Sequence, residues 1–178
     1  MAGIKVNINT IQWTHLTEVL NRLGDYFIEQ ARNNILTGGN PPYTNNNATG
    51  TLSNSMQKIV QIGEDEFSVS VSIAEYWKYL NYDTRPHWPN VGAIRQWIEV
   101  KPVKPRVDNG KRLPTVDQLA FLIGRKISIE GTKGTHFFDK AKDDTLAYYE
   151  EAIDLAITED VDEYIVSLVD YEELWKSL

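Results

Sequence analysis

The residues that could carry out acid–base or metal chemistry are scattered along this sequence. The chain has three histidines, His15, His87 and His136, and no cysteine. None of the three has the spacing to another histidine, or to a pair of carboxylates on a helix, that zinc sites use. We therefore expect structural or surface roles for the histidines, and the sequence predicts no metal site.

Motifs for a nucleophile or a phosphate-binding loop are also missing. The sequence lacks the Gly-x-Ser-x-Gly turn that exposes a catalytic serine. The segment GTKGT at 131–135 contains Gly, Lys and Thr but not the Gly-x-x-x-x-Gly-Lys-Thr frame of a phosphate loop. Glu150, Glu151 and Asp154 could cluster, but in so acidic a helical segment they are typical of a solvated face. The sequence predicts no catalytic residue, no cofactor and no enzyme activity.

One loop has the residue types of a nucleic-acid contact. Trp88 and Trp97 precede a group of five basic residues, Lys101, Lys104, Arg106, Lys111 and Arg112. Basic residues with aromatic neighbours can bind single strands through phosphate contact and base stacking. The whole chain nevertheless has a net charge of -7, whereas a dedicated nucleic-acid binder is usually basic. Non-specific DNA contact by this loop, inside a larger assembly, stays open, and so does contact with an acidic arm.

Composition indicates a globular domain with an uneven distribution of charge. The 178 residues are 42% hydrophobic and 24% charged, which is ordinary for one domain. We expect no signal peptide, because the start of the chain lacks a basic segment followed by a continuous apolar stretch. We expect no membrane partner, because no apolar stretch approaches the length that spans a bilayer. Residues 1–142 hold 17 basic and 13 acidic residues, whereas residues 143–178 hold one lysine and twelve acidic residues. The acidic segment is either a solvated helix face or an arm that docks on a basic surface.

The pattern of apolar residues predicts an α+β fold. Steps of three and four residues predict an N-terminal helix over about 10–36. Apolar residues alternate with serine over 67–73 and follow a short strand pattern at 58–62. Together these two patterns predict an antiparallel β-hairpin, a small sheet with one dry face that packs against helices.

Several short helices should follow the hairpin. The aromatic segment 76–82 is compatible with one or two helical turns. Asn90 can cap a helix over 91–100. Thr115 can cap another over 116–130, which Gly131 would end.

A long helical pattern begins near Asp139 and continues to the C-terminus, with a break expected near Thr158. We therefore divide the chain into an α+β domain, 1–158, and an acidic helical arm, 159–178. The pattern predicts a buried apolar stripe made of Leu146, Tyr149, Ile153, Ile157, Val161, Tyr164, Ile165 and Leu168. We expect its first half to cover the hairpin, and the part beyond Asp160 to contact a partner. Leu174 and Trp175 are interface candidates there.

Three segments form an ordered pattern: ATGTLSNSM, then YWKYLNYDTRPHWPNVGAIRQWIE, then LAFLIGRKISIEGTKGTHFFDKA. Over about residues 10–160 this order resembles the tail-completion or head–tail connector (neck) proteins of tailed bacteriophages. In that family Thr-Gly-x-Leu-x-x-Ser leads into a hairpin, an aromatic helix ends in Gly-Thr-Arg-Pro-His, and Gly-Thr-x-x-x-x-Phe-Phe leads into the last helix. Asp83 stands where the family usually has glycine before Thr84, so we expect this turn to be built differently.

The resemblance implies a structural virion protein, assembled in the host cytoplasm. Such a protein forms a homo-oligomeric ring in the neck, around the DNA channel, and contacts portal or adaptor proteins and tail proteins. The corner at Thr84–His87 would then face neighbouring subunits, with Tyr76, Trp77, Tyr79, Tyr82, Arg85, His87 and Trp88 as interface candidates. A tail-tube or tail-terminator subunit and a DNA-contacting accessory module remain as alternatives. It also stays open whether the four aromatic residues of 76–82 simply pack in the core.

Overall fold

The computed structural model describes residues 11–38, 49–63, 66–101 and 113–168. Within these residues the fold is α+β, as the sequence predicts, with six helices and one two-stranded antiparallel sheet. The elements in chain order are α1 (Thr14–Thr37), α2 (Thr51–Asn54), β1 (Gln57–Ile62), β2 (Phe67–Ser72), α3 (Trp77–Asn81), α4 (Val91–Val100), α5 (Val116–Glu130) and α6 (Phe137–Leu168). None of these helices is long and apolar enough to cross a membrane.

The chain divides into two compact units. The first, which we call the hairpin unit, consists of Met1–Gln30, Gln57–Ser72 and Ala141–Leu178. The second, the corner unit, consists of Ala31–Met56 and Ile73–Lys140. By sequence the hairpin unit has 5 basic and 18 acidic residues, a formal charge of -13, and the corner unit has 13 basic and 7 acidic residues, a formal charge of +6. The two units therefore carry opposite charge.

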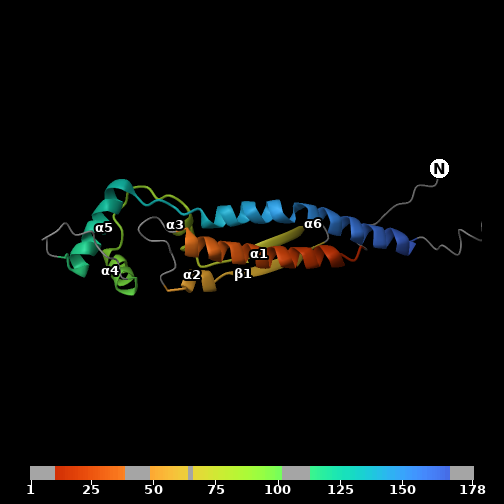
Figure 1. Ribbon diagram of the computed structural model, residues 1–178, viewed down its shortest axis with the longest axis horizontal. Coiled ribbons are helices and arrows are strands. Elements are labelled where there is room, and N and C mark those ends of the chain that lie inside the picture. The colour runs from red at the N-terminus through yellow and green to blue at the C-terminus, as the bar shows by residue number, and fades with distance from the viewer. Residues whose placement is uncertain (1–10, 39–48, 64–65, 102–112, 169–178) are drawn as a thin grey trace, which may run out of the picture. The chain divides into compact units, whose positions relative to one another are not determined.

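The hairpin unit is built from α1, α6 and the β-hairpin, which lie alongside one another in Figure 1. Leu16 contacts Asp160 near one end of the helix pair, and Tyr26 stacks on Tyr148 further along, so α1 and α6 run antiparallel. The core of the unit consists of Leu16, Val19, Leu20 and Ala156, with Trp13, Val60, Val69, Tyr149, Ala152 and Ile153 packed around them. Burial of these side chains is the main driving force for the unit to fold.

The hairpin has one face toward this core, as its alternating sequence predicts. Val60 pairs with Val69 and both pack on the core, whereas Ile59 pairs with Ser70 on the opposite face. Lys58, two residues before Val60, lies on the same inward face of the hairpin. Its ammonium group is 2.6 Å from the carboxylate of Asp25 in α1. Its aliphatic stem lies over Gly24, where an added Cβ would come within 3.1 Å of the lysine Cδ. The glycine thus allows the strand to lie close to α1.

One expectation for α6 is wrong, and a second is confirmed only in part. The helix has no break near Thr158, because it is continuous from Phe137 to Leu168. Its buried positions on the hairpin unit are mostly small or polar, namely Ala141, Thr145, Ala156 and Asp160, whereas Leu146, Leu155, Ile157, Ile165 and Val166 of the same helix are exposed. Small side chains allow α6 to approach α1 closely. Tyr149 and Ile153 of the predicted stripe also pack on the core, whereas Leu146, Ile157 and Ile165 of that stripe are exposed. The predicted boundary at 158/159 therefore falls within one helix.

In the corner unit the predicted helix ends are confirmed. Asn90 Oδ1 accepts a hydrogen bond from the backbone N–H of Ala93 and caps α4. Thr115 and Gln118 form a reciprocal capping box at the start of α5. Gly131 ends α5 with a φ of 75° and a ψ of -161°, a backbone conformation that is essentially restricted to glycine. These local signals explain why the sequence places α4 and α5 correctly.

Candidate functional site

The corner that follows α3 is held by one buried polar side chain, Asn81. Its side chain is fully buried and donates through Nδ2 to Asp139 Oδ2 at 2.9 Å. Its Oδ1 accepts from the backbone N–H of Phe138 at 2.8 Å. Its own carbonyl accepts from the N–H of His136 at 3.0 Å. Asn81 therefore joins the end of α3 to the start of α6, and the sequence analysis did not single it out.

The second and third segments of the sequence pattern meet at Thr84 and Thr132. The N–H of Thr84 donates to the carbonyl of Thr132 at 2.9 Å, and their hydroxyl groups lie 2.7 Å apart. A Cβ on Gly131 would overlap the Thr84 carbonyl oxygen, so only glycine allows this approach. The Thr-Arg-Pro-His segment and the Gly-Thr segment thus form one joint.

Asp83, which replaces the glycine usual at this position in the resembled family, takes part in the same joint. Its Oδ1 accepts a hydrogen bond of 2.7 Å from the backbone N–H of Gly134. A Cβ on Gly134 would collide with the carbonyl of Asn81, which explains the glycine there. The turn is therefore built with a side-chain acceptor, in line with the expectation that it would differ.

The Thr-Gly-x-Leu-x-x-Ser segment also has identifiable structural roles. Gly50 has a φ of 78° where the chain enters α2, and Leu52 is buried. The hydroxyl of Ser55 accepts from the backbone N–H of Ala74 at 3.0 Å, which ties α2 to the segment after β2. All three quoted segments thus contribute backbone geometry or hydrogen bonds within the corner unit.

The aromatic residues around the corner divide into inward and outward positions. Trp77 is half-buried. The centroid of its ring lies 4.6 Å from that of Phe138 and 5.9 Å from that of Tyr82. Tyr79 and Trp88 are 73% and 58% exposed. The other interface candidates that the structure leaves exposed are Tyr76, Tyr82, Arg85 and His87. The alternative in which all of the aromatic residues of 76–82 pack in the core is therefore wrong, whereas their place in an interface stays a prediction.

An apolar groove opens beside these exposed residues. It has a volume of about 860 Å³ and lies between the corner, α4 and α5, and its lining includes Tyr79, Trp88, Ala93, Ile94, Trp97 and Ile127. His87 is also part of the lining, and its Nδ1 lies 2.8 Å from the carbonyl oxygen of Arg85. The ring of Trp88 meets Phe121 edge to face at 5.9 Å. Such a surface can hold an apolar side chain or a helix face, but its lining offers no paired acid and base for catalysis.

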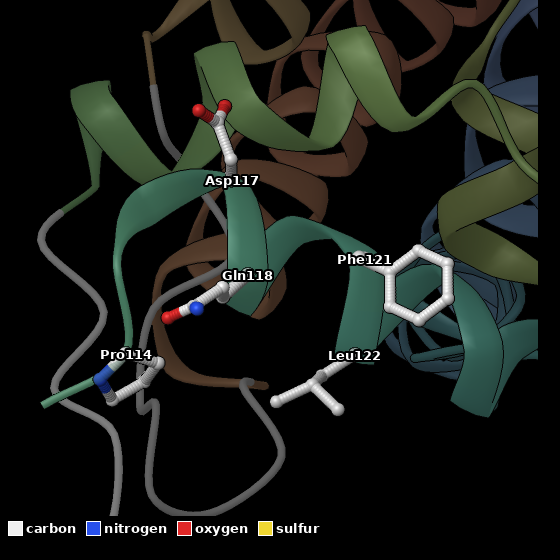
Figure 2. A pocket seen from close by; sticks show the side chains of 5 residues that line it. All are labelled: Pro114, Asp117, Gln118, Phe121 and Leu122. Carbon is white, nitrogen blue, oxygen red and sulfur yellow. The ribbon is translucent and has the colours of Figure 1, made fainter. Parts of the chain in front are cut away.

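A second, smaller depression of about 440 Å³ lies beside the first turns of α5. Figure 2 shows its five lining side chains, Pro114, Asp117, Gln118, Phe121 and Leu122. They point in different directions rather than toward a common point. Asp117 is paired with Arg95 of α4 at 3.4 Å. We assign no ligand to this depression, because its polar groups do not converge.

In the hairpin unit the structure brings together three titratable residues that sequence spacing did not reveal. Ligand atoms of His15, Asp160 and Glu163 lie within 4.8 Å of one another. Both oxygens of Asp160 are already engaged, because Oδ1 accepts from the N–H of His15 and Oδ2 from the N–H of Leu16, each at 2.9 Å. Asp160 therefore acts as an acceptor for the free N–H groups at the start of α1. Residues 145 positions apart give no local signal of this pairing.

The same contacts shift two pKa values in opposite directions. The hydrogen bond to Asp160 raises the pKa of His15, and the nearby Glu163 adds to this effect. Burial alone would raise the pKa of Asp160, but hydrogen bonds from the backbone of Leu16 and from His15 outweigh burial and lower it. The pair is thus stabilised as imidazolium and carboxylate.

The remaining candidates divide between described and undescribed parts of the chain. Lys101 is half-buried at the end of α4, and burial lowers its pKa. Six further candidates lie outside the described residues, namely Lys104, Arg106, Lys111, Arg112, Leu174 and Trp175.

Comparison with protein-family models, with curated proteins and with solved structures finds no match to this chain.

Proposed function

We propose that this chain is a structural subunit of a tailed-bacteriophage neck. It forms a homo-oligomeric ring between the portal side and the tail, around the channel through which DNA leaves. Its partners are further copies of itself, portal or adaptor proteins, and tail proteins. Its work is assembly, and it has no catalytic step.

The joint at Thr84 and Thr132 carries this proposal. The resemblance rests on short segments of the sequence, and two of them meet there through three hydrogen bonds, with Gly131 allowing the close approach. A joint of this kind supports a rigid corner, and that corner holds Arg85 and Trp88 exposed. Arginine and aromatic residues are enriched in protein–protein interfaces. The corner therefore suits contact with a neighbouring subunit better than it suits substrate binding.

The opposite charges of the two units add a second line of support. The hairpin unit has a formal charge of -13 and the corner unit one of +6. The hairpin unit of one copy can therefore attract the corner unit of another copy. Contact between unlike surfaces generates rings when the rotation between copies closes. The copies then need no separate adaptor to associate.

The positive charge of the corner unit also favours one other function, a DNA-contacting accessory module. In that case the isolated protein should bind single-stranded DNA, with an affinity that falls steeply as salt rises. The neck proposal instead expects weak, non-specific DNA binding that does not depend on Trp88.

The test is the assembly state of the purified full-length chain, measured by light scattering and by negative-stain electron microscopy. We expect closed rings at high protein concentration. The position of the chain in the phage particle then separates a neck ring from a tail-tube or tail-terminator subunit. A chain that stays monomeric at all concentrations, alone and with portal and tail proteins, contradicts the proposal.

A further inference from the structure

One exposed side of α6 carries two large side chains that their own unit covers only in part, since the ring of Tyr148 stacks on Tyr26 of α1. Tyr148 and Leu155 are 68% and 59% exposed. They are seven residues apart, which places them on the same side of the helix, about 10 Å apart along its axis. Glu151 lies between them, one turn from each, and Asp144 precedes Tyr148 by one turn. We call this surface the outer face of α6: an apolar pair flanked by acidic residues.

The groove of the corner unit has the complementary properties. Its lining is largely apolar and aromatic, and α4 along one side has ten residues, a length of about 15 Å. The two helical turns from Tyr148 to Leu155, about 10 Å along the axis, fit within this length. Lys126 is next in sequence to Ile127 of the groove lining. Arg85 lies two positions before His87 of that lining, and the unit has a formal charge of +6.

We infer that the outer face of α6 in one copy docks in the groove of the corner unit in a second copy. The occupant is a second copy because the two surfaces match in both apolar character and charge, and both are exposed within one chain. An amphipathic helix lying in an apolar groove is a common mode of recognition. The inference rests on the proposed ring and adds to it which two surfaces meet.

The contact is directional, because a groove on one unit receives a helix on the other unit. Each copy then uses its groove toward one neighbour and its α6 toward the next, so every copy makes two contacts. High salt should weaken the contact, since the charge attraction is screened over about 8 Å at physiological ionic strength.

Two single substitutions damage one surface each. Ala93→Glu places a carboxylate in the groove at an exposed position in the first turn of α4, where acidic residues are tolerated. Leu155→Glu removes an apolar contact from the outer face of α6. Leu146→Glu is the matched control, because Leu146 is 52% exposed on the same helix but nine residues away, on the opposite side.

The test is the mass of the full-length variants, alone and mixed, measured by light scattering. Ala93→Glu and Leu155→Glu should each weaken self-association by about 30-fold, the effect of a central contact residue, and give monomers. Mixed in equal amounts, they should form a one-to-one dimer and nothing larger, because one intact groove then meets one intact α6. The Leu146→Glu control should assemble as the unmodified chain does.

Two results would overturn the inference. If the unmodified chain forms rings but the mixture stays monomeric, or if either variant still assembles, these surfaces do not meet, while the proposed neck function stands. If the unmodified chain itself does not assemble under any condition, the docking and the ring both fall. Circular dichroism of each variant shows whether the monomers are folded.

Discussion

The two units of the molecule use their aromatic and apolar residues in different ways. The hairpin unit encloses Leu16, Val19 and Leu20 between two helices and a sheet. The corner unit is joined at its corner largely by hydrogen bonds, at Asn81 and at the Thr84–Thr132 pair, and leaves Tyr79 and Trp88 exposed. Both units bury apolar side chains, and the corner unit encloses Ile35, Leu52 and Phe137, but its polar joints also keep large side chains available for contact.

The largest loss of stability should come from the core of the hairpin unit. Leu16 is only 2% exposed and lies at the centre of this core. Leu16→Ala should lower the free energy of unfolding by about 2–5 kcal/mol, because it removes buried methyl groups and leaves a cavity. Urea unfolding measures the change. Leu155→Ala, at a 59% exposed position, is the control and should change stability by about 0.5 kcal/mol or less. Equal losses in the two variants would contradict this description of the core.

The next largest loss should come from the joint of the corner unit. Asn81→Ala removes the acceptor of the hydrogen bond from the Phe138 N–H and the donor of the hydrogen bond to Asp139. Each unsatisfied buried group costs about 1–3 kcal/mol, and partial access of water places the expected total near the lower end of that range. Urea unfolding again reports the loss. Asn81→Asp keeps one acceptor but places a carboxylate beside Asp139, so it should not restore stability; full stability in either variant would remove Asn81 from the joint.

A smaller effect should appear as a pH dependence in the hairpin unit. The pKa of His15 is raised, so its contribution to stability is complete below about pH 6.5, its usual pKa, and is lost as pH rises through the higher folded value. The carboxylates that act on His15 are those of Asp160, the more distant Glu163 and Glu159. The pKa of Asp160 is lowered, so its contribution is present above about pH 3.9 and is lost only in stronger acid.

Urea unfolding at pH 5.5 and pH 8.5 tests this pair. The unmodified chain should lose more stability between these two pH values than a His15→Gln variant, which cannot titrate at this position. An identical pH dependence in the two proteins would show that the contact with Asp160 does not favour the charged imidazole.

The smallest effect on stability, with a large effect on assembly, should come from Trp88. Because Trp88 is 58% exposed, Trp88→Ala should change the free energy of unfolding by less than about 1 kcal/mol, well below the 3–5 kcal/mol typical of a buried tryptophan. Assembly should nevertheless weaken, since Trp88 lines the groove. Thermal melting by circular dichroism, beside light scattering, separates the two effects. A melted monomer would place Trp88 in the core instead.

Local signals explain how much of the fold the sequence predicted. The helix caps at Asn90 and Thr115, the glycine stop at Gly131 and the alternation in β2 depend on neighbouring residues, and the structure confirms all of them. The face of α6 that packs was predicted only in part: Tyr149 and Ile153 pack on the core, but Leu146 and Ile157 are exposed, because bulk was taken as the sign of burial. Ala156 and Asp160 are buried instead, since close approach to α1 requires small or hydrogen-bonded side chains.

The candidate site was less predictable, because its contacts are long-range. Thr84 and Thr132 are 48 positions apart, and Asn81 and Asp139 are 58 positions apart. No local pattern indicates such pairs, and only their order within the resembled family suggested that these segments belong together. The exposure of Tyr79 and Trp88 could not be read from the sequence either, since aromatic residues at helical spacing are equally typical of a core.

Cryo-electron microscopy of the purified full-length chain tests the central claim most directly. We predict a closed ring in which every copy has the same two neighbours, with the groove of each corner unit filled by the Tyr148–Leu155 side of α6 from the adjacent copy. Particles that are monomers, or dimers in which both copies use the same surface, would contradict it.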